Sequence, residues 1–171
     1  IELKSGQIID ATFVPVPIQR NGREDNALIK AGAVPIEWGP EGDKPNKLAH
    51  KDTDARWTKK GGQSHYGYKS HINIDKDTKL IASHACTDAS EQEQSLKESQ
   101  HTSQINERAY RGKPLSEAQE SSNKAKSRVR ARVEHVFGHM ENSMGGIFVR
   151  SIGIARAKVG VALMNLTYNL S

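Results

Sequence analysis

Two carboxylates and one guanidinium are the side chains of this chain best placed to do chemistry. Asp10 interrupts an apolar, β-branched run over residues 7–16 that is typical of a strand. An ionised carboxylate is costly to bury there, so it must be neutral, paired or bound to a cation. Glu134 follows Arg130 by one helical turn, and this arginine could hold the glutamate or contact a phosphate. The structural alternatives are a hydrogen-bonded edge-strand aspartate and a surface ion pair.

A small sheet must position Asp10. Residues 64–74 and 80–87 alternate as strands do, and residues 75–78 between them have the composition of a turn. We therefore predict an antiparallel hairpin over 64–87 that pairs with the strand 7–16.

Two helices should complete the domain. Ser116 and Gln119 match the capping box that begins a helix, and this helix should end near residue 140. Its buried stripe at helical spacing consists of Val129, Val133, Val136, Phe137 and Met140. A second helix, over 154–170, should bury the face made by Ala155, Val159, Ala162, Leu163, Leu166 and Leu170. The elements predict a single α/β domain over residues 1–171.

Two stretches look like loops. Residues 18–62 are crowded with glycine, proline, asparagine and lysine, and residues 88–115 are almost wholly polar. Within the second stretch, residues 90–107 should be poorly ordered, because few apolar side chains offset the entropy of ordering.

The charge pattern favours a polyanionic partner. The chain carries a formal net charge of +5, and its basic residues gather at 44–71 and 101–132. From these stretches we take as candidate nucleic-acid contacts Lys59, Lys60, Lys69, Arg108, Arg111, Lys113, Arg128 and Arg132. The aromatic residues among them suit either base stacking or core packing, namely Trp38, Trp57, Tyr66 and Tyr68. Two solvated basic faces are the structural alternative.

A few residues bear on the cellular compartment of the protein and on whether it has a zinc site. The single Cys86 suits a reducing compartment and is expected to be a small buried side chain. No apolar run reaches membrane-spanning length and no signal peptide is evident, so we expect a cytoplasmic, nucleoid-associated protein without a membrane partner. His135 and His139 have zinc-ligand spacing, but the neighbouring acid precedes the first histidine, which disfavours a zinc site.

Several segments together resemble the DDE transposases of bacterial insertion sequences, specifically the insertion sequence five family. The acid-bearing strand at 9–12 and the arginine-studded helix at 128–138 resemble the family's first and last catalytic segments. Residues 65–71 resemble its second strand, and residues 106–115 and 145–170 resemble its C-terminal portion. The resemblance covers nearly the whole chain.

The resemblance implies a ribonuclease-H-like fold, here reduced to an antiparallel three-strand core with C-terminal helices. It implies DNA transposition, in which acids hold two Mg²⁺ or Mn²⁺ ions that cleave and transfer phosphodiesters. Asp10 would be the first acid and a metal ligand, Glu134 the last acid and a metal ligand, and Arg130 the helix arginine.

One departure from the family puts catalysis in doubt. The family's second aspartate lies on a fourth strand, whereas here only residues 88–105 separate the hairpin from the segment that begins at 106. Asp88 would lie about 10 Å to the side of Asp10, too far to take the place of the missing second aspartate. The family's DNA-end-binding region is also missing, and the chain starts at Ile1. We therefore expect an N-terminally truncated, internally deleted and inactive transposase.

Two other functions remain open. The chain could be a non-catalytic DNA-binding remnant, or a remnant that associates with itself or with full-length transposase.

Overall fold

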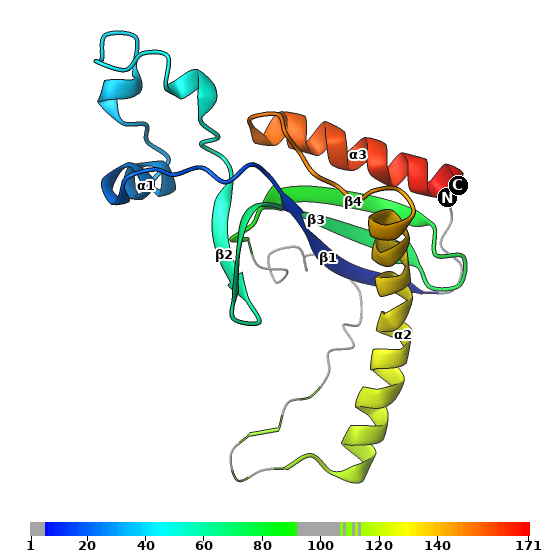
Figure 1. Ribbon diagram of the computed structural model, residues 1–171. Helices are drawn as coiled ribbons and strands as arrows, with labels where there is room; N and C mark the ends of the chain where they lie inside the picture. The colour runs from blue at the N-terminus through cyan, green and yellow to red at the C-terminus, as the bar shows by residue number, and fades with distance from the viewer. Residues whose placement is uncertain (1–5, 92–106, 108, 111, 113) are drawn as a thin grey trace.

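A four-stranded antiparallel sheet forms the centre of the structure, which is a computed structural model that describes residues 6–91, 107, 109–110, 112 and 114–171 (Figure 1). The strands are β1 (Gln7–Pro15), β2 (Arg56–Lys60), β3 (Gln63–Asp75) and β4 (Ile81–Asp88). The long β3 pairs with all three others. Because Gly67 pairs with both Pro15 and Arg56, β1 occupies one edge of β3, and β2 and β4 follow one another along the opposite edge.

The predicted hairpin and its pairing with the first strand are confirmed. β3 and β4 pair on either side of a turn, and β1 runs antiparallel to β3 with Asp10 opposite Ile72. Alternation along β1 places Ile8, Asp10 and Val14 on one face, and all three are buried. Strand β4, which corresponds to the predicted strand 80–87, lies two strands away from Asp10 on β1.

Both helices are also confirmed. They are α2 (Glu117–Asn142) and α3 (Ile154–Leu170). At the start of α2 the Ser116 hydroxyl accepts a hydrogen bond from the Gln119 backbone N–H, and the Gln119 side chain accepts one from the Ser116 N–H. Val133, Val136 and Met140 of α2 pack on the isoleucines of the sheet, whereas Val129 is 40% exposed. The N-terminal half of α2 projects beyond the sheet (Figure 1), which explains why the predicted stripe is not buried along its whole length.

The predicted buried face of α3 is wrong. Val159, Leu163, Leu166 and Leu170 are exposed, and Ala157, Val161 and Asn165 are buried instead. Apolar residues occur all round this helix, so spacing alone did not distinguish its two sides. The side chain of Asn169 helps to set the orientation, because it accepts a hydrogen bond from Ile81 N–H and donates one to Ile81 C=O, both 2.9 Å.

The prediction of a loop over residues 18–62 is wrong in part. The stretch contains α1 (Arg23–Lys30), the short helices η1 (Ile36–Trp38) and η2 (Leu48–His50), and β2. Trp38 is almost fully buried and Lys47 lies over its ring, so the segment has a small core of its own. Strand β2 forms because β3 extends far enough to pair with it. In Figure 1 these helices lie to one side of the sheet.

A buried carboxylate joins this segment to α3. Asp52 accepts hydrogen bonds from the Tyr68 hydroxyl at 2.7 and 2.8 Å and from the Gly153 N–H at 3.2 Å. Asp54 accepts one from the Ile154 N–H, at the first residue of α3. The positive end of the helix dipole thus faces two carboxylates, which stabilises both. Burial, followed by the hydrogen bond to Asp52, raises the pKa of Tyr68.

The mixed α/β class with an antiparallel sheet and C-terminal helices is confirmed. Most of the predicted loop over residues 88–115 and of the poorly ordered segment 90–107 lies outside the described residues. None of the helices that the structure describes is long and apolar enough to cross a membrane.

Candidate functional site

Asp10 and Arg130 form the centre of the candidate site. The Asp10 side chain is 9% exposed, because it lies on the sheet face that α2 covers. Arg130 donates from Nε to Oδ2 at 3.0 Å and from Nη2 to Oδ1 at 2.9 Å. Oδ1 also accepts a hydrogen bond from the Ala11 N–H at 2.8 Å. Both oxygens of Asp10 are therefore bonded, and the planar guanidinium matches the carboxylate as a two-point partner.

The placement of Arg130 follows from how α2 packs. Val133 and Val136 are fully buried against the sheet, and they hold the preceding helical turn over the edge strand β1. Arg130 remains 53% exposed at this edge, so its guanidinium can reach the carboxylate beside it. The sequence predicted that Arg130 would hold Glu134 or a phosphate, and the contact with Asp10 was not foreseen.

Glu134 lies one turn further along α2 and is exposed. Positions four residues apart share one side of a helix, so Glu134 and Arg130 lie on the same flank. In the described part of the chain Glu134 makes no ion pair or hydrogen bond that would turn it toward Asp10.

Asp88 is too far away to complete an acidic cluster with Asp10. Asp88 pairs with Tyr68, whereas Asp10 pairs with Ile72, four positions along β3. Two strand spacings combined with this offset separate the two backbones by about 16 Å. Asp88 instead accepts a hydrogen bond from the Ser90 N–H at 2.8 Å.

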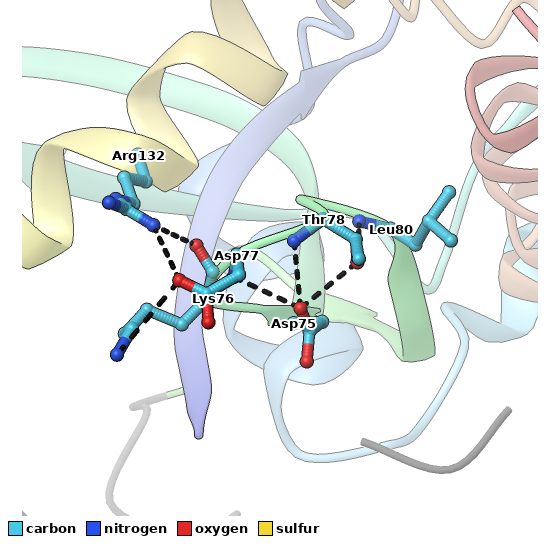
Figure 2. A network of polar contacts seen from close by, with 6 residues as sticks. All are labelled: Asp75, Lys76, Asp77, Thr78, Leu80 and Arg132. Atoms are coloured by element: carbon cyan, nitrogen blue, oxygen red, sulfur yellow. Dashed lines mark hydrogen bonds and ion pairs between the residues drawn. The ribbon is translucent and has the colours of Figure 1, made fainter. Parts of the chain in front are cut away.

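Arg132, a predicted nucleic-acid contact, is used within the protein. It donates to Lys76 C=O and pairs with Asp77 at 3.1 Å, which ties α2 to the β3–β4 turn. Figure 2 shows this turn, where Asp75 accepts hydrogen bonds from the Asp77 and Thr78 N–H groups and from the Thr78 hydroxyl. Arg132 therefore holds the hairpin in place.

Comparison with known proteins decides the family. The sequence model described as "Transposase DDE domain" matches residues 2–96 and 91–170. The chain belongs to this family. A relative of this DDE domain, "Transposase for insertion sequence element IS1106" from Neisseria meningitidis serogroup B, is 28% identical to it over 201 residues. That alignment includes 99% of the DDE domain chain but only 65% of the relative, so the chain spans less than two thirds of the relative's length. No solved structure matches this DDE domain.

The described residues of this DDE domain do not fit a two-metal centre. No group of three or more histidine, cysteine, aspartate or glutamate side chains among them could hold a metal ion. Both carboxylate oxygens of Asp10 accept hydrogen bonds from the Arg130 guanidinium. The positive charge of this group lies where a metal cation would need to approach. His135 and His139 belong to no such group either, and the His139 ring meets the edge of Tyr168.

The other predicted DNA contacts of the DDE domain are dispersed. Lys59 and Lys60 are exposed on the β2–β3 hairpin, and Arg128 is exposed on the projecting half of α2. In Figure 1 the hairpin and this half of α2 extend in the same direction from the two ends of the sheet. Lys69 donates to Glu91 C=O. Arg108, Arg111 and Lys113 lie outside the described residues.

Of the four candidate stacking aromatics, the DDE domain exposes only Trp57, at 46%. Trp38, Tyr66 and Tyr68 are buried, as is Cys86 in agreement with its prediction. Phe13 and His65 form a stacked pair that the sequence did not predict, with ring centroids 4.2 Å apart. In the β1–β3 register Phe13 lies opposite Lys69, four positions along β3 from His65, so strand alternation and pairing do not predict this stack.

Proposed function

We propose that the chain is part of an insertion-sequence transposase, of the insertion sequence five family, and that it binds DNA but does not cleave it. The observation that carries this proposal is the two-point ion pair between Asp10 and Arg130. An acid that neutralises a guanidinium has lost much of its attraction for a divalent cation. Glu134 alone supplies too little negative charge for two cations held close together.

An internal deletion accounts for the small number of acids. The two family matches overlap at residues 91–96, as expected if the segment that normally separates them is missing. The alignment with the relative is 201 residues long although the chain has 171, which also supports missing residues. We assign Asp10 and Glu134 to the family's first and last acids, with Arg130 as a positioning residue. The missing aspartate would be their usual companion in holding Mg²⁺ or Mn²⁺.

DNA binding is the part of the family function that this chain retains in our proposal. Lys59, Lys60 and Arg128 are exposed and make no ion pair with the described residues. Cationic side chains on two projections can neutralise several phosphates without reading a sequence. This favours the non-catalytic DNA-binding remnant over an active enzyme.

The experiment is a cleavage and strand-joining assay on DNA that carries the element's ends, with Mg²⁺ or Mn²⁺. We expect no product from this chain, and no change on Asp10→Asn or Glu134→Gln. DNA binding by the same protein, prepared in parallel, serves as the control for correct folding. Cleavage that is abolished by Asp10→Asn but retained by the surface control Asp43→Asn would contradict the proposal.

A further inference from the structure

The outer side of α3 is an apolar surface that no other described helix or strand covers. Its large side chains are Val159, Leu163, Leu166 and Leu170, which are 59%, 58%, 55% and 79% exposed. Their spacing of four, three and four residues places them in one stripe, as in the contact line of paired helices. Contiguous apolar side chains of this kind on a monomer mark a site of association.

The stripe does not become buried by a rotation of α3. On the inner side Ala157 and Val161 are fully buried in the core. Asn169 is anchored by two hydrogen bonds to the backbone of Ile81 on β4. Turning α3 over would break these hydrogen bonds and expose the residues that now pack on the sheet. Among the residues that the structure describes, none covers the outer stripe, which is therefore free to contact another molecule.

We propose that this molecule is a second copy of the chain, whose α3 packs antiparallel on the first. The charges of the helix support this occupant. Arg156 and Lys158, near the N-terminus of α3, are its only charged side chains. Antiparallel packing brings them next to the last turn of the partner's α3, where exposed carbonyls form the negative end of the helix dipole. Parallel packing would bring like charges together.

The composition around the stripe also allows the helix to meet itself. No charged side chain occurs from Val159 to the end of α3, so pairing buries no ion. A helix of 17 residues is about 25 Å long, and a contact along one such helix is smaller than the ~800 Å² per partner of a standard interface. The dimer is therefore weak and depends on protein concentration. This inference is independent of DNA binding or cleavage.

Sedimentation velocity over a concentration series tests the association. The unaltered chain should pass from monomer to dimer as its concentration rises. Leu163→Lys or Leu166→Lys should raise the dimer dissociation constant by at least about tenfold, because each places a charge in the centre of the contact. Ile36→Lys is the matched control, since Ile36 is 92% exposed in a distant segment, and it should leave the constant unchanged. Circular dichroism confirms that each variant is folded.

Several results would overturn the proposal. They are a monomer at every concentration, a dimer that Leu163→Lys does not weaken, and a monomer that binds neutral lipid vesicles through the same stripe. The last outcome would make the face a membrane contact.

Disulfide trapping tests the orientation. In a Cys86→Ala background, Val159→Cys chains are mixed with Leu170→Cys chains, one of which carries a tag to distinguish their sizes. Antiparallel packing centred between Leu163 and Leu166 predicts that the mixed disulfide forms in preference to either self-disulfide. Self-disulfides of Val159→Cys without the mixed product would show parallel packing and contradict the proposed arrangement.

Discussion

Arg130 and Asp10 lie 120 positions apart in the sequence and meet through two hydrogen bonds of 3.0 and 2.9 Å. The contact joins α2 to the edge strand β1, and it neutralises a carboxylate that would otherwise be buried with its full charge. The same contact keeps the positively charged guanidinium of Arg130 close to Asp10, where a metal ion would need to approach. One interaction therefore contributes to stability and opposes metal binding.

Removing Arg130 should destabilise the protein more than removing the charge of Asp10. Arg130→Ala leaves a buried carboxylate without its partner, and since the guanidinium is half exposed we expect a loss of about 1–2 kcal/mol in unfolding free energy. Asp10→Asn should cost less, because Arg130 can turn toward water. A urea double-mutant cycle measures the coupling between the two positions. Strict additivity of the two changes would contradict a direct interaction.

Asp52 should matter more for stability than Asp54, although both face the start of α3. Asp52→Ala leaves the buried Tyr68 hydroxyl and the Gly153 N–H without an acceptor, which should cost about 2–4 kcal/mol. Asp54→Ala removes one hydrogen bond to the Ile154 N–H and should cost about 1 kcal/mol. Urea unfolding of both variants gives the comparison. Equal losses would show that the buried network around Asp52 is not the stronger contact.

Alkaline pH should destabilise the protein through its buried tyrosines. Burial, followed by the charge of Asp52, raises the pKa of Tyr66 to about 12. The unfolded chain loses this proton near pH 10 while the folded chain keeps it, so the unfolding free energy should fall as pH rises from about 10 toward 12. Tyr66→Phe should make this decline shallower. Unfolding free energies that stay constant over this range would contradict the assignment.

DNA binding should be weak, independent of sequence and steeply dependent on salt. If about four phosphates are neutralised, log K should fall with log salt concentration at a slope near −4. The double variant Lys59→Gln and Lys60→Gln should reduce the steepness by about two. Lys44→Gln is the matched control, because Lys44 already pairs with Glu37 at 3.0 Å. Fluorescence anisotropy with two unrelated duplexes tests this, and strong selectivity for one of them would contradict it.

Features that depend on neighbours in the sequence could be predicted from the sequence. The start of α2 follows from Ser116 and Gln119, which satisfy each other's backbone N–H groups within one turn. The β3–β4 hairpin follows from alternation on both sides of a turn. The resemblance to the DDE transposases also came from segments of sequence, and the family match confirmed it.

Features that depend on long-range packing were decided by the tertiary structure. The sequence placed Arg130 near Glu134, because residues one turn apart on a helix are neighbours, but only the docking of α2 on the sheet brought it to Asp10. Spacing could not choose between the two apolar sides of α3, whereas Asn169 chooses by its hydrogen bonds to Ile81. The sequence thus determined β1, the β3–β4 hairpin, α2 and α3, whereas β2 forms only because β3 is long enough to pair with it. Packing between distant segments determined which side chains meet, since burial and hydrogen bonding across the sheet cannot be read from local periodicity.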